Sequence, residues 1–336
     1  MKKENTLFKF DSKVNDILEI AYSFQKSRVL LTACELGVFN NLGEEQKTAD
    51  ELAAELDCNA KALERLLNAL VSIKLLEKSG LKFANSSTSW NLLVKGNQHY
   101  LGNLPHINNL YHDWTNLTKV IKKGISGTGK GLNFANNKER EDFVAAYHWR
   151  AQEQAPIIAK MLDLSSSSRL LDLGGGSGAY SMEFIKAFPH LDVTIYDQPE
   201  MIKITQEYLD IKGFSGRINT MEGDFTKDRL PKNHYDVIFM SLILHHFSFW
   251  ECMDIIKNVY DSLRTGGRII IHEMILNDNR TSPEFSTDYS LNLLVNSKSG
   301  DVFTEAELWI MLKESWLSNI EKRETEFGTV LFIGRR

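Results

Sequence analysis

A glycine-rich stretch is the strongest chemical signal in the sequence. It reads LLDLGGGSGAY over residues 170–180 and places glycines at Gly174, Gly176 and Gly178. Glycines with this spacing allow a sharp turn after a strand and a close approach of a ligand to the main chain. Ser177 would then begin a helix whose free N–H groups face the same place. The pattern predicts a nucleotide-type site.

Carboxylates at three expected strand ends indicate which nucleotide would bind. Asp172 lies two residues before the glycines, where it could orient the loop or meet an ammonium group. Asp197 ends the second strand and can accept hydrogen bonds from both hydroxyls of a ribose. Gln198, which follows it, is assigned to the same site. Asp224 ends the third strand beside Phe225, which offers an acceptor for an adenine amino group and an aromatic face.

Two cofactors are compatible with this loop. The run from Gly174 to Ala179 satisfies the dinucleotide pattern with alanine in the third place, so NAD is one candidate. The positions of Asp172 and of Asp224 with Phe225 favour S-adenosylmethionine instead. An oxidoreductase that uses NAD stays open as an alternative.

A histidine follows the expected fourth strand. The apolar run 235–244 leads directly into His245, at the edge where open α/β sheets bind ligands. An isolated histidine is more often structural than catalytic. A histidine at this edge could act as a base toward a bound hydroxyl such as a phenol, which is a poor nucleophile while it keeps its proton. The pKa of a phenol, about 10, lies about 3.5 units above that of free imidazole, so complete proton transfer before the reaction costs free energy. Proton removal concerted with group transfer lessens this free-energy cost.

Short apolar runs alternate with helical segments from Arg169 onward. The expected strands are 169–173, 191–197, 217–225, 235–244 and 267–276, with a last pair near 320–327 and 328–334. Helices are expected from Ser177, from Pro199, over 248–263 and from Thr304. Such alternation predicts an α/β fold with a mostly parallel, doubly wound sheet.

The first half of the chain predicts helices and a winged helix. Apolar residues at helical spacing run over 13–36 and stop at Gly37, and Thr48 with Glu51 forms a capping-box pattern. A second helix over 61–78 and a hairpin near 78–84 complete the winged-helix pattern. We expect a domain boundary at 163–168, which gives a helical domain over 1–165 and a cofactor-binding domain over 166–336.

Charge argues against DNA binding by this winged helix. The segment 59–76 has three basic residues and one acid, and the preceding helix carries four acids that would repel phosphates. A packing and dimerisation module is therefore the favoured interpretation. A winged-helix regulator that senses the cofactor is the alternative.

Composition excludes several classes of function. The 336 residues are 43% hydrophobic with a formal net charge of −5, so no basic excess favours a polyanion. The longest apolar run, 237–244, is too short to span a membrane, and residues 1–10 show no secretion signal. Cys34, Cys58 and Cys252 have no metal-ligand spacing, so we expect no metal site and a cytoplasmic protein.

The sequence resembles the S-adenosylmethionine-dependent O-methyltransferases of the caffeic acid and acetylserotonin type, with their bacterial relatives. The motifs that carry the resemblance are LDLGGGSGAY, TIYDQPEMI, GDF, LHHFSFWECMDIIKNVYDSLRTGGRIIIHEMIL and FTEAEL. They extend over nearly the whole chain. The resemblance implies a class I (Rossmann-like) methyltransferase sheet preceded by a winged-helix domain that forms a homodimer.

The resemblance also assigns roles to residues. It implies cofactor contacts from Gly174, Asp197, Asp224 and Phe225. Phe247 stands where the family usually has an indole beside the cofactor, and Ser241 stands where plant members carry a cofactor-contacting lysine.

His245 falls on the histidine that deprotonates the acceptor hydroxyl in this family. Glu273 matches the carboxylate that orients that imidazole and stabilises its charged form. His246 replaces the usual aspartate and is expected outside the reacting centre. A second acid of the plant members is replaced by Val302, and the adjacent Asp301 should point elsewhere.

Aromatic residues in two helical segments are expected either around the acceptor or in the core: Tyr111, His112, Trp114, Tyr147, His148 and Trp149. Together these features predict a methyltransferase that acts on a hydroxyl of a small, aromatic metabolite and binds neither nucleic acid nor membrane. C- or N-methylation, decarboxylation or a pericyclic step by a cofactor-binding relative is the alternative.

Overall fold

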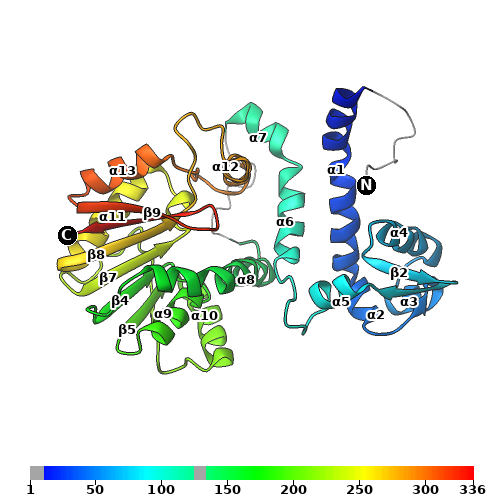
Figure 1. The fold of residues 1–336 in the computed structure, drawn as a ribbon, viewed down its shortest axis with the longest axis horizontal. Coiled ribbons are helices and arrows are strands. Elements are labelled where there is room, and N and C mark those ends of the chain that lie inside the picture. The colour runs from blue at the N-terminus through cyan, green and yellow to red at the C-terminus, as the bar shows by residue number, and fades with distance from the viewer. Residues whose placement is uncertain (1–10, 125–133) are drawn as a thin grey trace. The chain divides into compact units, whose positions relative to one another are not determined.

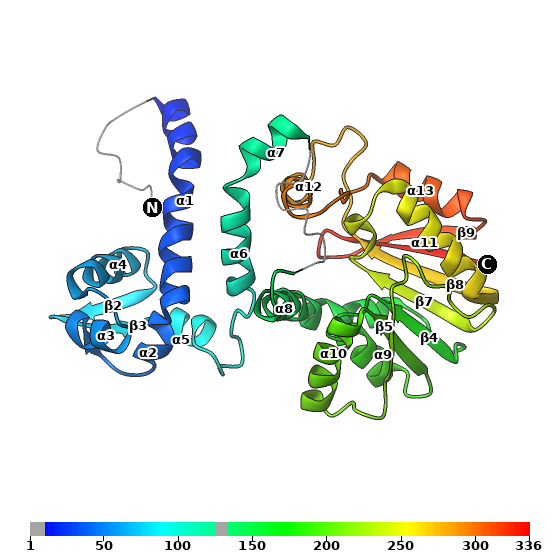
Figure 2. The same cartoon turned by 180° about the vertical axis from the view of Figure 1, so that it is seen from behind.

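The computed structural model describes residues 11–124 and 134–336. Contacts within the chain divide it into two compact units, Met1–Asn108 and Asn109–Arg336, which Figures 1 and 2 show from two sides. The segment 1–10, in which the sequence shows no secretion signal, lies outside the described residues. No helix in the described part of the chain has both the length and the apolarity that a membrane span needs.

The first unit contains a long helix and a winged helix. Its helices are α1 (Ser12–Leu36), α2 (Val38–Leu42), α3 (Ala49–Glu55), α4 (Ala60–Ser72) and α5 (Ser87–Leu93). Its strands form an antiparallel sheet in the order β1 (Lys47–Thr48), β3 (Lys82–Asn85) and β2 (Leu76–Ser79). The capping box is confirmed, since Glu51 accepts a hydrogen bond from the Thr48 amide at 2.7 Å and donates its own amide to the Thr48 hydroxyl.

The second helix of the winged helix is shorter than the sequence predicts. α4 ends at Ser72 rather than near residue 78, and Lys74 takes a left-handed φ of 65°. This turn directs the chain into β2, in which Leu76 pairs with Asn85. Leucine periodicity continues through the turn, so the sequence alone does not reveal that the helix ends six residues early, at Ser72, and that the hairpin begins two residues early, at Leu76.

The division between the two units falls well before the expected boundary at 163–168. α6 (Leu104–Trp114) crosses it, and α7 (Leu117–Lys123) and α8 (Asn137–Met161) follow in the second unit. α8 packs on α9 (Ala179–Ala187), and its Ala155 and Ile158 lie fully buried in a core cluster shared with the sheet. A serine-rich loop marks the end of α8, but the tertiary contacts of α8 decide which unit it joins.

The second unit is a seven-stranded sheet between two layers of helices. The strands are β4 (Arg169–Leu173), β5 (Asp192–Asp197), β6 (Asn219–Glu222), β7 (Tyr235–Ser241), β8 (Leu263–Glu273), β9 (Ser318–Glu324) and β10 (Val330–Arg335). Their order is β6-β5-β4-β7-β8-β10-β9, and β10 pairs antiparallel with both neighbours while the other described pairs are parallel. The doubly wound sheet is thus confirmed.

Helices cover both faces of this sheet (Figures 1 and 2). α8, α9 and α10 (Pro199–Lys212) lie on one face, and α11 (Phe249–Ser262) and α13 (Glu305–Glu314) on the other. α12 (Glu284–Asn296) follows β8 and was not expected from the sequence. Strands covered in this way are buried on both faces, which explains their continuous apolar runs.

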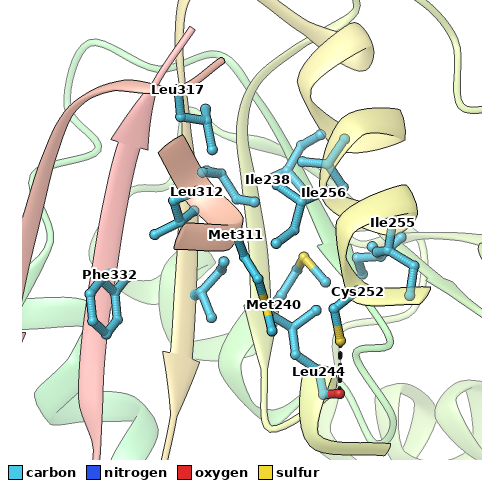
Figure 3. Packing of buried hydrophobic residues seen from close by; sticks show 14 of the residues in the cluster. Ile238, Met240, Leu244, Cys252, Ile255, Ile256, Met311, Leu312, Leu317 and Phe332 are labelled. Atoms are coloured by element: carbon cyan, nitrogen blue, oxygen red, sulfur yellow. Dashed lines mark hydrogen bonds between the residues drawn. The ribbon is translucent and has the colours of Figure 1, made fainter. Parts of the chain in front are cut away.

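Alternate residues of each strand enter different cores. In β7, Val237 and Phe239 join the cluster under α8 and α9, whereas Ile238 and Met240 join the cluster under α11 and α13. Figure 3 shows the second cluster, in which Cys252 also donates to the Leu244 carbonyl oxygen at 3.2 Å. The two core clusters pack on opposite faces of the sheet and so hold the ends of β7 in place.

Asp172 is an ionisable residue within this apolar sheet. Its side chain is 1% exposed and accepts a hydrogen bond from the Ser181 hydroxyl of α9 at 2.6 Å. Burial, with the nearby Asp197 carboxylate, raises the pKa of Asp172 to about 7. The carboxyl group therefore resists ionisation in the folded chain.

This shift predicts a pH dependence of stability. Because the pKa of Asp172 is higher in the folded than in the unfolded chain, protonation favours folding, and that contribution is lost as the pH rises from about 4 to about 7. We expect the loss to reach at most about 1.4 kcal/mol per pH unit, measured by urea unfolding of the ligand-free protein. Asp172→Asn should reduce this slope, and the exposed Asp278→Asn should keep it. An unchanged slope in Asp172→Asn contradicts the assignment.

Candidate active site

A cavity of about 310 Å³ lies at the carboxyl ends of the central strands. Its wall includes the loop after β4, the end of β5 and the turn after β7. The chain begins the sheet at β4 and adds β5 on one side and β7 on the other, so the strand order reverses here. Open α/β sheets bind ligands at this kind of position.

The glycine loop forms one side of the cavity. Gly174 and Gly176 take left-handed φ values of 71° and 53°, and the Gly174 amide donates to the Tyr196 carbonyl oxygen of β5 at 2.8 Å. A Cβ added to Gly176 would meet nothing within 4 Å, so its backbone is open to the cavity. An open backbone at this position is compatible with the close ligand approach that the glycine spacing predicts.

Gly178 lies outside the cavity wall. It precedes α9 with a φ of 76°, and an added Cβ would lie 2.8 Å from Cδ1 of Ile195. The absence of a side chain there lets α9 pack closely against β5. The sequence grouped Gly178 with the ligand-binding glycines because spacing alone does not separate the two roles.

Asp197 lies at the end of β5, directly beside the glycine loop. Its carboxylate is 7% exposed and accepts hydrogen bonds from the amides of Gly176 at 3.0 Å and Gln198 at 2.8 Å. Burial raises its pKa to about 6. An ionised carboxylate has about four acceptor sites, so two remain for donors such as ribose hydroxyls. Gln198 and Asp172 also line the cavity.

Asp224, Phe225 and Phe247 line one end of the same cavity. Asp224 is held by the Lys227 ammonium group at 2.6 Å and the Thr226 amide at 3.0 Å. The two phenylalanine rings meet edge to face, with 5.8 Å between their centroids. A carboxylate beside two aromatic rings is suited to an adenine ring and its amino group.

Ser241 lines the cavity but is also bound to β8. Its hydroxyl lies 2.9 Å from Nδ1 of His272, and Nε2 of His272 lies 2.7 Å from the Thr329 hydroxyl. Burial lowers the pKa of His272 to about 4, so this imidazole is neutral at pH 7. Sequence reasoning missed His272, although an ionisable residue within the apolar run 267–276 is a usable signal.

His245 and Glu273 form a buried pair at the ends of β7 and β8. Nδ1 of His245 lies 2.8 Å from Oε2 of Glu273, and the two side chains are 1% and 2% exposed. The other carboxylate oxygen accepts the Leu244 amide at 2.9 Å. One carboxylate thus fixes both the imidazole and the 3₁₀ turn Leu244–His246 that carries it.

Neither member of this pair is part of the described cavity wall. His246 is part of it, although the sequence placed this residue outside the reacting centre. Burial lowers the pKa of His246 well below its ordinary value, with a further contribution from His245. A neutral imidazole therefore lines the cavity next to the buried pair.

Two tyrosines lie between the cavity and His245. Tyr147 of α8 lines the cavity, and its hydroxyl is hydrogen-bonded to the hydroxyl of Tyr289 in α12. The Tyr289 hydroxyl lies 3.5 Å from Nε2 of His245. Nothing in the sequence indicated Tyr289, because the helix that holds it carries no recognisable motif.

The position of the missing second acid is apolar. Val302 is fully buried in a cluster with Leu242 and Met274, while Asp301 pairs with Arg280 at 3.0 Å. Leu242 lies at the end of β7 with a left-handed φ of 56°, and its amide donates to the His272 carbonyl oxygen at 2.8 Å. Asp301 thus points elsewhere, as expected.

Of the six aromatic residues proposed for the acceptor pocket, Tyr147 alone is in the described cavity wall. Trp114 instead donates to the Asn292 side chain at 3.0 Å, and His148 contacts the Ser177 hydroxyl at 2.8 Å. Phe134 and Phe143 line the cavity beside Tyr147. One of the two predicted helical segments thus contributes to the cavity wall, and the orientation of each side chain depends on packing.

The wall therefore combines a nucleotide-type half and an aromatic half. The first has an open glycine backbone and buried carboxylates that accept hydroxyl or ammonium donors. The second has aromatic rings next to the His245–Glu273 pair. Within 11–124 and 134–336 there is no group of three or more His, Cys, Asp or Glu side chains arranged to hold a metal ion.

Comparisons with known proteins match two separate parts of the chain. A family described as "O-methyltransferase domain" matches residues 114–316, and "O-methyltransferase dimerisation domain" matches residues 18–95. Acetylserotonin O-methyltransferase of Gallus gallus is 30% identical over 95% of this chain and 96% of its own. The 3-hydroxy-5-methyl-1-naphthoate 3-O-methyltransferase of Streptomyces sahachiroi is 28% identical over 90% and 89%.

One relative is named for a different reaction. The N,N-dimethyltransferase OxyT of Streptomyces rimosus is 25% identical over 79% of each chain. Among solved structures, PigF with SAH matches with a TM-score of 0.88 and 25% identity over 96% of this chain and 99% of that one. The sequence motifs, the sheet and these matches lead to one conclusion. The chain belongs to the S-adenosylmethionine-dependent O-methyltransferases.

Proposed function

We propose that this protein transfers a methyl group to a hydroxyl of a small aromatic metabolite, with His245 as the general base. The observation that carries the proposal is the buried His245–Glu273 pair next to the aromatic half of a cavity whose other half suits a nucleotide. S-adenosylmethionine supplies a methyl group on a positively charged sulfur.

In the nucleotide half of the cavity, carboxylate acceptors match the hydroxyl and amino donors of the cofactor. Asp197 accepts the ribose hydroxyls, and Asp224 accepts the adenine amino group beside Phe225 and Phe247. The open backbone at Gly176 admits the cofactor close to the main chain. The chemistry of this donor and acceptor set agrees with S-adenosylmethionine.

His245 is held ready to receive a proton. Because the Glu273 carboxylate accepts at Nδ1, the hydrogen of the neutral imidazole is assigned to Nδ1, and Nε2 keeps its lone pair. The same carboxylate stabilises the imidazolium that forms when Nε2 takes a proton. The residues therefore need only position the acceptor, exclude water and accept one proton.

The acceptor half of the wall favours a flat ring. The centroids of Phe134 and Phe143 lie 5.0 Å apart, and those of Phe143 and Tyr147 lie 4.3 Å apart. Such rings stack on or meet the edges of another aromatic system. The named acceptors of the chicken and Streptomyces relatives are aromatic hydroxyl compounds, which supports the same class for this chain.

N-methylation is the alternative with a specific observation behind it. OxyT is an N,N-dimethyltransferase by name, and Val302 leaves this chain without the second acid of the plant members. A nitrogen acceptor that already carries a lone pair needs less help from a base. Loss of activity on removal of His245 separates the two reactions.

We also propose that the protein is a homodimer. Residues 18–95 match the dimerisation domain, and α1 exposes apolar side chains in the single chain. Ile17 and Ile20 are 68% and 75% exposed, and Phe24 is 52% exposed. A second copy would cover this face. The cytoplasmic location stays a prediction from the three unpaired cysteines.

The first test concerns the cofactor. S-adenosylmethionine should raise the melting temperature, and NAD should not. Asp197→Ala should weaken S-adenosylmethionine binding by at least about 1.5 kcal/mol in calorimetry, because charge-assisted hydrogen bonds to the ribose disappear. Asp192→Ala, an exposed change on the same strand, is the matched control. Equal affinity in Asp197→Ala and wild type would remove Asp197 from the site.

The second test concerns the dimer. Light scattering at micromolar concentration should give twice the mass of the chain. The double change Ile17→Glu with Ile20→Glu should produce a monomer, because two carboxylates cannot be buried in an apolar interface without a large cost. Ile211→Glu, at a 79% exposed apolar position on α10, should leave the mass unchanged. A wild-type monomer excludes the proposed assembly.

The third test concerns the base. With 1-naphthol as a neutral acceptor, His245→Ala should lower kcat by about 10²–10⁴, the usual worth of general base catalysis, with little change in cofactor affinity. Glu273→Gln should lower it less. The exposed His190→Ala is the control. A wild-type rate in His245→Ala means that another group removes the proton.

A further inference from the structure

The described cavity wall does not include the proposed base. Nε2 of His245 is the atom that must receive the proton, and the side chain is 1% exposed. Among the described residues, the hydroxyl of Tyr289 contacts Nε2 at 3.5 Å. An acceptor hydroxyl in the cavity therefore needs a route to Nε2.

Tyr147 and Tyr289 provide such a route. Tyr147 lines the cavity, and its hydroxyl is hydrogen-bonded to that of Tyr289. The Tyr289 ring meets the His245 ring edge to face, with 5.3 Å between centroids. The contacts thus form a continuous series from the cavity through two hydroxyls to His245 and on to Glu273 at 2.8 Å.

Both tyrosines have the properties of a proton relay. A phenol hydroxyl donates one hydrogen bond and accepts others, so it can take a proton on one side while it gives up its own on the other. Burial raises the pKa of Tyr147, and it raises that of Tyr289 well above the ordinary value. Both hydroxyls therefore stay protonated at neutral pH.

Charged groups on the neighbouring elements shift the pKa values of the two tyrosines in opposite directions. The Arg150 guanidinium of α8 lies 5.6 Å from the centre of the Tyr147 ring and lowers the pKa of both tyrosines. The Glu273 carboxylate of β8 raises the pKa values of both tyrosines. Arg150 makes no ion pair with a described residue, so its positive charge also favours negative charge that develops on an acceptor oxygen.

We propose that Tyr147 and Tyr289 carry the proton of the acceptor hydroxyl to His245. The proposal rests on the function proposed above, in which His245 is the base. The 3.5 Å contact is long for a hydrogen bond and has to shorten by about 0.5 Å in the reacting complex, as such contacts often do once substrate binds.

Atoms, electrons and charge are conserved in this transfer. The acceptor O–H bond breaks, and its proton joins the Tyr147 oxygen while the Tyr147 proton moves to Tyr289 and the Tyr289 proton moves to Nε2 of His245. The acceptor oxygen uses a lone pair to bond the methyl carbon, and the electrons of the carbon–sulfur bond stay on sulfur. The positive charge thus moves from sulfur to the imidazolium, which Glu273 stabilises.

A relay and a purely structural tie between α8 and α12 predict different results. We would replace each tyrosine by phenylalanine, which removes the hydroxyl and keeps the ring. With 1-naphthol, Tyr289→Phe and Tyr147→Phe should each lower kcat by about 10-fold to 100-fold, within the range for proton-transfer groups. With 4-nitrophenol at pH 8.5, where the acceptor is ionised and needs no base, the loss of kcat in each variant should be clearly smaller than the loss with 1-naphthol. Tyr260→Phe on α11 is the control.

The double variant with His245→Ala identifies the shared path. Groups on one proton path are non-additive, so Tyr289→Phe should cost less than 2-fold in the His245→Ala background. Full additivity, or equal losses with both acceptors, would overturn the relay and leave His245 as the base. If wild type methylates neither phenol, the proposed function itself fails.

An acceptor-independent readout completes the test. In ¹⁵N-histidine spectra of the protein with S-adenosylhomocysteine, Tyr289→Phe should shift the Nε2 resonance of His245 and leave that of His272 unchanged. An unshifted His245 resonance means that the two groups are not in contact in solution, which also overturns the relay.

Discussion

The two oxygens of the Glu273 carboxylate determine the geometry of the reacting half of the site. One accepts the Leu244 amide and the other meets Nδ1 of His245, so a single buried side chain fixes the turn and the ring together. This arrangement requires the ends of two strands to lie side by side. The parallel pairing of β7 with β8, in which Ser241 lies opposite His272, provides that register.

The two halves of the cavity stabilise charge in different ways. The cofactor half contains carboxylates whose pKa values are raised by burial, so a cation and hydroxyl donors would favour the ionised state that burial disfavours. The reacting half contains the neutral imidazole of His246, since burial lowers the pKa of this residue well below its ordinary value. Positive charge is therefore favoured at the cofactor and at the Glu273-supported imidazole.

Features set by neighbouring residues could be predicted from the sequence. The β4 strand, the glycine turn and the capping box at Thr48 depend on contacts within a few positions, and each lies where expected. The resemblance identified His245 and Glu273, and the fold brings the two side chains together. Gly178, the short α4 and the unit boundary could not be predicted, because long-range packing determines each of them.

The same distinction explains the tyrosines. Tyr147 belonged to an aromatic group from which the sequence could not choose, and Tyr289 lay in a helix that no local signal indicated. Their contact joins positions 142 residues apart. A pair of hydroxyls that meet across such a separation leaves no pattern in a single sequence, so structure is required to find it.

Leu242 shows how packing sustains a strained backbone at the entry to the catalytic turn. Its left-handed φ of 56° is strained for a residue with a bulky side chain, at a cost on the order of 1 kcal/mol. A glycine would relieve that strain, but it would empty the apolar cluster shared with Val302, and truncation of a buried leucine costs about 2–5 kcal/mol. Packing and the positioning of His245 therefore both retain the larger side chain, so substitutions that make the fold more robust should arise away from this turn.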